Sequence, residues 1–332
     1  MRGLRTVPHL WTLCEDMKQV CPEAFLLQYV NPMAINTWAI GAKYPEIRQI
    51  GLCHSVQGTT VELAADLGLE VSDLKYKVAG INHMAFYLEL NAKQSDGSFQ
   101  DMYPRLLEDY KDGKIPKFPG ANERCLNFVR YEFMKHFGYF VTESSEHFSE
   151  YVPWFIKSHR PDLISHFGIP LEEYPKRCEE QIIEWLDHAE VLESGKDINH
   201  QPSQEYAACI MNALITGQQC NVYGNVVNKG YIPQLPEGAA VEVECIVTEN
   251  SIQPQIVKNI PVSLIALIRT NINVQELVVD ALLNENRDSI YHAAMLDPHT
   301  AAELDLNEIR NMVDELIAEH GNWMPSWLQQ AK

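Results

Sequence analysis

Residues 25–55 read FLLQYVNPMAINTWAIGAKYPEIRQIGLCHS, and this stretch decides the fold class of the chain. The short apolar run 25–30 ends at Asn31, before a proline, and a helical pattern follows, which predicts a strand, a sharp turn and a helix. The same order returns with a strand over 49–53 and a helix over about 56–67. Two buried strands that each lead into a helix predict the end of an α/β unit.

Polar side chains stand where these two strands end. Asn31 follows the first strand, and Cys53 and His54 follow the second. Because ligands of open α/β sheets bind outside the carboxyl ends of the strands, these residues form a candidate pocket. One or two further strands are expected over 75–90, with His83 at their centre. The pocket would then offer a thiol, two imidazoles and an amide, although such residues are more often packed in a core than used as ligands.

The rest of the pattern shows no repeat and no linker that would cut the chain into modules. A turn-rich loop is expected at 91–97, and strands are expected within 221–248. In the second region Val241, Val243 and Cys245 alternate with acidic residues, as in a half-exposed strand. Helices are expected at 9–21, 102–112, 123–137, 172–190, 203–216 and through most of 261–328.

The length, charge and cysteine content of the chain exclude several classes of protein. With 332 residues, 46% of them hydrophobic, the chain can bury a substantial core in one large domain or two coupled ones. Its 45 acidic residues outnumber the 26 basic ones, and the formal charge of −19 opposes binding to nucleic acid and to anionic lipid. No signal peptide is expected, and no stretch approaches the roughly 20 apolar residues of a membrane span. The eight cysteines form no CxxC pair, which predicts reduced thiols and a cytoplasmic protein.

Four ordered motifs carry a family resemblance that extends over essentially the whole chain. They are VNPMAINTWAI (30–40), IGLCHSVQGT (50–59), AGINHMAFYLEL (79–90) and GYFVTESSEHFSEYVPWF (138–155). The chain resembles glycoside hydrolase family 4, and most of all its α-galactosidase members. The resemblance implies that residues 1–70 are a remnant of a Rossmann-type sheet like that of lactate and malate dehydrogenases. It implies a C-terminal α+β domain for catalysis and oligomerisation in residues 71–332, and therefore a homo-oligomer.

The resemblance also implies roles for four residues. Cys53 in GLCHS and His83 in GINHM match the family's two protein ligands for a catalytic divalent ion, usually Mn²⁺. A thiolate is an unusual partner for Mn²⁺, and sequence chemistry alone would suggest zinc or iron. Asn31 matches the substrate-binding amide, although an Asn before Pro also commonly starts a turn. His54 matches the position of the general acid in galactosidase-like members.

The chemistry that the resemblance implies needs NAD. NAD⁺ removes hydride from C3 of the sugar, the metal polarises the resulting ketone, a base takes the C2 proton and an acid protonates the departing oxygen. Water then adds and the hydride returns. The base stays open among Tyr139, Glu143 and His147, because the tyrosine could be a core ring and the other two an i, i+4 helix pair.

The sequence departs from the family pattern at its start. The pyrophosphate of NAD needs a glycine-rich turn at a helix N-terminus, and no GxGxxG-like run occurs here. Roughly the first hundred residues of the pattern are expected to be absent, and we expect this polypeptide alone neither to bind NAD⁺ measurably nor to hydrolyse α-galactosides. Three hypotheses follow: an α-galactosidase such as a melibiase whose N-terminal part is encoded elsewhere, an α-galacturonidase-like enzyme, or a truncated remnant that only folds and oligomerises.

Overall fold

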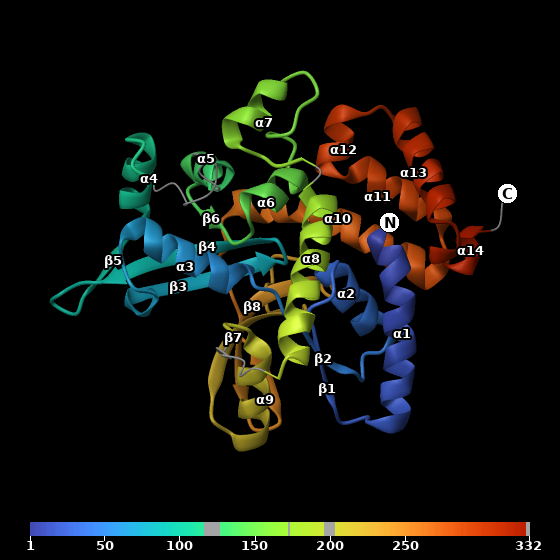
Figure 1. The fold of residues 1–332 in the computed structure, drawn as a ribbon, viewed down its shortest axis with the longest axis horizontal. Helices are drawn as coiled ribbons and strands as arrows, with labels where there is room; N and C mark the ends of the chain where they lie inside the picture. Colours follow the sequence, from blue (N-terminus) through green and yellow to red (C-terminus); the bar gives the residue numbers. More distant parts are fainter. Residues whose placement is uncertain (116–126, 172, 196–202, 330–332) are drawn as a thin grey trace.

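The computed structural model describes residues 1–115, 127–171, 173–195 and 203–329 (Figure 1). In these residues nine strands form one mixed sheet, in the order β1-β2-β7-β8-β3-β4-β5, with β6 paired to β4 and β9 paired to β8. The strands are β1 (Phe25–Gln28), β2 (Arg48–Gly51), β3 (Leu74–Ile81), β4 (Met84–Lys93), β5 (Phe99–Asp101), β6 (Phe140–Val141), β7 (Cys220–Val227), β8 (Ala240–Thr248) and β9 (Ser251–Pro254).

The parallel pair β1 and β2 is the α/β unit that the sequence predicts. Helix α2 (Met33–Lys43) connects the two strands, and α3 (Ser55–Leu67) follows the second. β2 then meets β7 in antiparallel orientation at Gly51 and Asn225. The α/β class with a Rossmann-type unit is confirmed, and the same sheet continues through the strands of the C-terminal part.

Helices cover both faces of the sheet, and the C-terminal ones gather at one end of the molecule (Figure 1). Helices α1, α2 and α10 pack against one another. The remaining helical segments are α1 (Arg2–Val20), η1 (Val71–Asp73), α4 (Tyr103–Lys111), α5 (Phe128–Phe137), α6 (Ser145–Tyr151), α7 (Pro161–Phe167), α8 (Glu173–Glu193), α9 (Tyr206–Thr216), α10 (Val262–Asn284), α11 (Arg287–Leu296), α12 (Pro298–Glu303), α13 (Leu306–His320), η2 (Gly321–Trp323) and α14 (Ser326–Gln329).

Several boundaries differ from the sequence-based expectation. The first helix begins at Arg2, earlier than the expected residue 9, and includes Pro8 in its interior. The packing of α1 along α2 offsets the backbone hydrogen bond that an interior proline cannot donate. The expected loop at 91–97 is shorter, since β4 continues to Lys93 to pair with β5. Part of the helix expected at 123–137 lies outside the described residues.

Strand β8 corrects the prediction of a half-exposed strand. β8 lies in the interior of the sheet, with β7 on one side and β3 on the other. Both faces are covered over residues 240–243, so Glu242 is buried as completely as its neighbours Val241 and Val243. From Glu244 onwards buried and partly exposed residues alternate, as the sequence predicts. The alternation of apolar and acidic residues predicts a strand with one face in water, but at Glu242 that face is covered by other parts of the protein.

The expectation that no stretch approaches a membrane span is wrong for helix α10. Its 23 residues are long and apolar enough to cross a membrane by length and composition alone. Half of the relevant segment is buried inside the protein, where Leu264, Ile268 and Ile272 join the core. Core helices of soluble proteins have the same composition, so the helix is explained by its packing.

The cysteines in the described residues are all free, as the prediction of reduced thiols requires. Cys14 and Cys245 are buried in the core, while Cys21 and Cys209 are exposed. Cys125 lies outside the described residues.

Candidate active site

A cavity of about 290 Å³ opens at the carboxyl ends of β1 and β2. Its wall combines the ends of these strands, the turn between β3 and β4, and the start of α6. The lining residues are Asn31, Cys53, His54, Ser55, Gly58, Thr59, Glu62, His83, Arg130, Thr142, Glu143, Ser144 and His147. All four site residues singled out in the sequence therefore line one pocket.

Three of these residues form a cluster suited to a metal ion. The Sγ of Cys53, a ring nitrogen of His83 and a carboxylate oxygen of Glu143 all lie within 4.8 Å of one another. Cys53 follows β2, His83 occupies the turn between β3 and β4, and Glu143 follows β6, which pairs with β4. His83 has a φ of 65°, a backbone conformation that non-glycine residues rarely adopt and that often marks functional sites.

Both ring nitrogens of His83 have a partner. Nε2 lies 3.2 Å from Oε2 of Glu143, and Nδ1 lies 3.1 Å from the hydroxyl of Tyr151. Burial raises the pKa of Tyr151 well above its usual range, so this phenol stays protonated. If Nδ1–H donates to the Tyr151 oxygen, the lone pair of Nε2 is directed to the cluster and can bind a cation.

The donor set fits a divalent cation. One sulfur, one nitrogen and one oxygen can approach a single ion, which then keeps further positions for water or substrate. The carboxylate of Glu143 supplies the oxygen ligand that Mn²⁺ prefers, which partly removes the objection to a thiolate. The sequence offers Glu143 only as a base or as half of an i, i+4 helix pair, and the residue in fact precedes α6. Its place in the cluster depends on the pairing of β6 with β4, which no motif spacing predicts.

Asn31 combines both roles that the sequence left open. Its Oδ1 accepts a hydrogen bond of 3.2 Å from the backbone N–H of Met33, so the side chain starts the turn into α2. The residue also lines the pocket. The turn therefore fixes the side chain beside the cavity.

His54 lies at the rim of the pocket, and two residues hold its ring. Its Nε2 makes a short hydrogen bond with the carboxylate of Glu205, the residue that directly precedes α9. The ring stacks on Tyr29, with 5.3 Å between the ring centroids. The Tyr29 hydroxyl accepts a hydrogen bond from the N–H of Ala207, so the start of α9 is tied to both aromatic side chains. Sequence analysis missed Glu205, because it is about 150 residues away from His54 along the chain.

Only two of the three base candidates reach the pocket. Glu143 and His147 line it, whereas Tyr139 lies outside the lining and packs edge-on against Tyr103. A hydrogen bond to Glu150 raises the pKa of His147. Its ring stacks parallel to that of His83 at 5.8 Å.

Glu242 is a buried carboxyl group beneath the cluster that sequence analysis missed. It pairs across the sheet with Gly80 of β3 and with Asn225 of β7, and the latter residue pairs with Gly51 of β2. The amide of Asn225 donates a hydrogen bond of 3.3 Å to Oε1. Burial raises the pKa of Glu242 to about 8, and the negative charge of the Cys53 thiolate adds to the shift.

Arg130 is the one Lys or Arg residue in the described lining of the pocket, and its charge is compensated. Its side chain is 2% exposed and forms an ion pair with Glu62. The guanidinium also donates hydrogen bonds to Asn127 and Thr59. A buried cation with this many partners is a structural element of the pocket wall.

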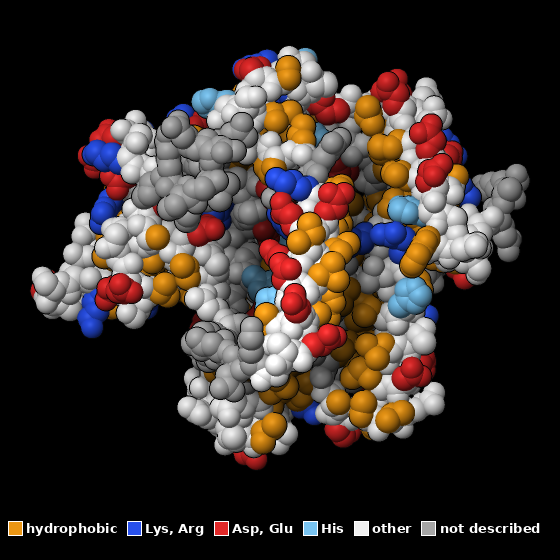
Figure 2. Space-filling model, in the orientation of Figure 1, with side chains coloured by type: hydrophobic (Ala, Val, Ile, Leu, Met, Phe, Trp, Pro, Cys, Tyr) orange, Lys and Arg blue, Asp and Glu red, His pale blue; other side chains and the backbone are white. Residues whose placement is uncertain are grey.

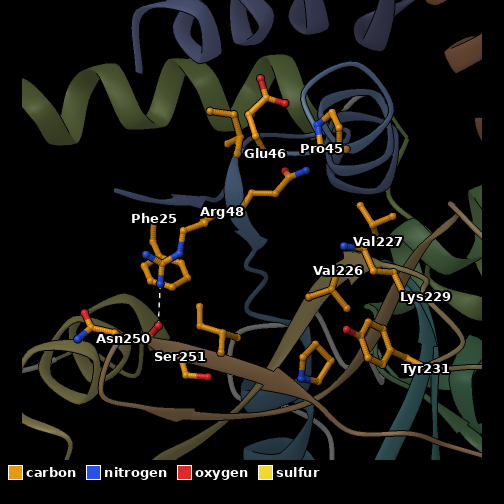
Figure 3. Close-up of a pocket in the computed structure, with 15 residues that line it drawn as sticks. Phe25, Pro45, Glu46, Arg48, Val226, Val227, Lys229, Tyr231, Asn250 and Ser251 are labelled. Atoms are coloured by element: carbon orange, nitrogen blue, oxygen red, sulfur yellow. Dashed lines mark hydrogen bonds between the residues drawn. The ribbon is translucent and has the colours of Figure 1, made fainter. Parts of the chain in front are cut away.

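A larger cavity of about 370 Å³ lies at the opposite ends of the same strands (Figure 3). It begins at Phe25 and Arg48, the first residues of β1 and β2. Arg48 stacks on the Phe25 ring and donates a hydrogen bond of 2.6 Å to the backbone oxygen of Asn250. None of the metal-binding cluster lines this cavity, so its size does not make it the active site.

The fold and the pocket together define a Rossmann-type α/β enzyme with a candidate metal centre at the strand ends. Residues 1–69 match the family described as Family 4 glycosyl hydrolase, and residues 78–300 match the Family 4 glycosyl hydrolase C-terminal domain. The chain belongs to glycosyl hydrolase family 4 and is a glycoside hydrolase.

Known relatives and solved structures agree with this assignment. An α-galactosidase of Bacillus subtilis is 43% identical over 326 residues, which cover 98% of this chain and 72% of that protein. An α-galactosidase of Rhizobium meliloti is 30% identical over 339 residues, which cover 98% of this chain and 66% of that protein. A 6-phospho-α-glucosidase from gut microorganisms, solved in complex with NAD and Mn²⁺, has a TM-score of 0.77 at 19% identity, over 97% of this chain and 73% of that one.

Proposed function

We propose that this protein hydrolyses α-galactosides such as melibiose, with Mn²⁺ and NAD as cofactors. The observation that carries the proposal is the cluster of Cys53, His83 and Glu143 in a pocket at the carboxyl ends of the strands. These three residues would hold the metal. When bound, Mn²⁺ supplies Lewis acidity and NAD⁺ accepts and returns hydride.

Three further tasks fall to side chains of the protein: binding the sugar, protonating the departing oxygen and removing a proton from the sugar. Asn31, fixed by its turn, is suited to hydrogen-bond a sugar hydroxyl beside the cluster. His54 is suited to deliver a proton to the departing oxygen, because Glu205 and Tyr29 orient its ring at the pocket rim. Of the two base candidates that line the pocket, Glu143 belongs to the metal cluster, so His147 is the side chain left to take the proton from the sugar.

Residues 1–332 contain no GxGxxG-like run for a pyrophosphate. The pocket supports a neutral sugar better than an acidic one. A galacturonide carries a carboxylate, and the described lining offers no lysine or uncompensated arginine to pair with it. An α-galactoside carries a hydroxymethyl group at the same carbon and needs no cation. This favours the galactosidase hypothesis over the α-galacturonidase-like one.

The test is a substrate panel with the purified protein, NAD⁺ and Mn²⁺. Melibiose and an α-galacturonide of the same leaving group are compared by kcat/KM, with and without chelator. Turnover of melibiose that is lost with chelator, and that is preferred over turnover of the galacturonide by about tenfold or more, would support the proposal and overturn the expectation that this polypeptide alone is inactive. The reverse preference would overturn the substrate assignment, and absence of turnover on both would support the non-catalytic remnant.

A further inference from the structure

A smaller cavity of about 120 Å³, the side cavity, adjoins the candidate active site. Asn31 lines both cavities, so the two meet at this side chain. The wall of the side cavity comes from the start of α2, the turn between β3 and β4, the end of α6, the middle of α10 and the residue before α12. Its described lining includes none of Cys53, His83, Glu143 and His54. The side cavity therefore offers neither a metal ligand nor the proton donor of the proposed reaction.

Two buried polar atoms in this wall lack a partner. Nδ2 of Asn82 and Oε1 of Gln275 have no hydrogen-bond partner among the described residues. Their side chains belong to residues that are only 7% and 8% exposed. Buried polar groups in native proteins are nearly always paired, because an unpaired one has lost its water without gaining a replacement. An unpaired donor and an unpaired acceptor in one small cavity indicate that the cavity receives a polar group.

Other polar side chains of the wall are held by the protein itself. Nδ2 of Asn271 donates a hydrogen bond of 3.3 Å to the backbone oxygen of Tyr151. The carboxylate of Asp297 accepts one of 2.8 Å from the backbone N–H of Thr300. These bonds fix the wall and leave the two unpaired atoms for the group that enters.

We propose that the side cavity binds the C6 hydroxymethyl group of a neutral hexose, an inference that rests on the proposed hydrolysis of α-galactosides. A hydroxyl group is both a donor and an acceptor. The C6 hydroxyl can therefore accept a hydrogen bond from Nδ2 of Asn82 and donate one to Oε1 of Gln275. Both buried atoms then gain a partner, and these two residues determine which sugar is accepted.

The choice of C6 follows from the division between the two cavities. In the proposed reaction the metal acts beside C2 and C3 of the sugar and His54 acts beside C1, and both belong to the larger cavity. The hydroxymethyl group takes no part in the reaction and extends by a carbon beyond the ring. It can enter a cavity of less than half the volume, 120 against 290 Å³, while the ring stays beside the metal cluster.

Charge favours a neutral group in the side cavity. The described lining contains the carboxylate of Asp297 and neither lysine nor arginine. A C6 carboxylate, as in a galacturonide, would meet this like charge, and it could not donate a hydrogen bond to Gln275. The surface also disfavours anions, because acidic side chains are spread over the visible face with few basic ones between them (Figure 2), in keeping with the formal charge of −19.

Isothermal titration calorimetry with free sugars tests the inference on the purified protein in the presence of Mn²⁺. D-galactose is compared with 6-deoxy-D-galactose and with galacturonate, and none of them has a glycosidic bond, so the readout does not depend on turnover. We expect galactose to bind at least about tenfold more tightly than the 6-deoxy sugar, because the latter leaves two buried atoms unpaired. Galacturonate should also bind more weakly than galactose.

Gln275→Met replaces the acceptor with an apolar side chain of similar length. The variant should bind galactose about tenfold more weakly and no longer distinguish it from the 6-deoxy sugar. Its free energy of unfolding should equal that of wild type, because Oε1 has no partner within the described fold.

Gln28→Met is the matched control. Gln28 is another buried glutamine whose Oε1 lacks a partner, but it lies outside the described lining of the side cavity, and its Nδ-equivalent amide nitrogen, Nε2, donates to Thr37 and Gln49. This control should lower stability, since it removes those hydrogen bonds, and it should keep the preference for galactose.

Four results would overturn the inference: equal affinity of wild type for galactose and the 6-deoxy sugar, no binding of either, tighter binding of galacturonate, or a Gln275→Met protein that still prefers galactose. The substrate panel tests the proposed hydrolysis separately. A preference for galactose without turnover would contradict the hydrolysis alone. Turnover of melibiose without that preference would contradict the C6 site alone.

Discussion

Nε2 of His83 lies 3.2 Å from Oε2 of Glu143, and both side chains are largely buried beside the thiol of Cys53. The two residues are separated by about 60 positions in the chain, and the pairing of β6 with β4 brings them together. A cation competes with protons for the thiol of Cys53 and the ring of His83, so metal binding should release protons.

Glu143→Gln should lower the affinity for Mn²⁺ by about tenfold to a hundredfold, since an amide oxygen is a weaker ligand than a carboxylate and leaves the site with one less negative charge. Isothermal titration calorimetry in two buffers of different ionisation enthalpy measures both the affinity and the released protons. The control is Glu150→Gln, an exposed carboxylate on the neighbouring α6. Equal Mn²⁺ affinity in the two variants would exclude Glu143 from the metal site.

His54→Gln should slow the hydrolysis of substrates with poor leaving groups far more than that of activated aryl galactosides, because only poor leaving groups need a proton from an acid. Glu205→Gln should show the same selectivity to a smaller degree, because Glu205 orients the ring without donating the proton. The measurement is kcat/KM for melibiose and for an aryl galactoside. Equal losses on both substrates would assign His54 to packing or positioning.

Glu242→Gln should change how stability depends on pH. The pKa of Glu242 is raised from 4.5 to about 8, so between these values the folded protein keeps a proton that the unfolded chain loses. The contribution of this group to stability is therefore constant below pH 4.5 and falls as pH rises towards 8. The loss is on the order of 5 kcal/mol for a full shift of this size.

Urea unfolding of the metal-free protein at pH 5 and pH 8 measures this effect. Wild type should lose more stability over that interval than Glu242→Gln, which cannot ionise. Glu244→Gln on the same strand is the control, because its side chain is only partly buried. Identical pH dependence in all three proteins would contradict the raised pKa of Glu242.

Arg130→Met should destabilise the protein by about 1–3 kcal/mol, because it leaves the buried Asn127 without its donor, while Glu62, which is 35% exposed, can be solvated by water. Arg160→Met removes an arginine from an exposed pair with Asp162 and should cost less than about 1 kcal/mol. The difference in free energy of unfolding between these variants is the readout. A similar small loss in both would show that the buried network contributes little.

The sequence alone determined the local elements and the edge at which the site forms. Apolar runs that end in polar residues define β1 and β2, and the side chains of Asn31 and Cys53 must then lie at the carboxyl ends of two parallel strands. The positions of these two strands and of the residues at their ends depend on neighbouring residues in the chain and on the two-residue period of a strand. Both can be read from a single sequence. The ordered motifs indicated the family for the same reason, since they preserve local spacing.

Only the tertiary structure decided which distant residues complete the site. Glu143 joins the cluster because β6 pairs with β4, and Glu205 reaches His54 because α9 begins beside it. Glu242 looked like a solvent-facing residue of an alternating strand and became a buried acid once β8 was enclosed by β3 and β7. Burial and pairing between remote segments are set by how the whole chain packs, and local periodicity contains no information about which segment covers which face.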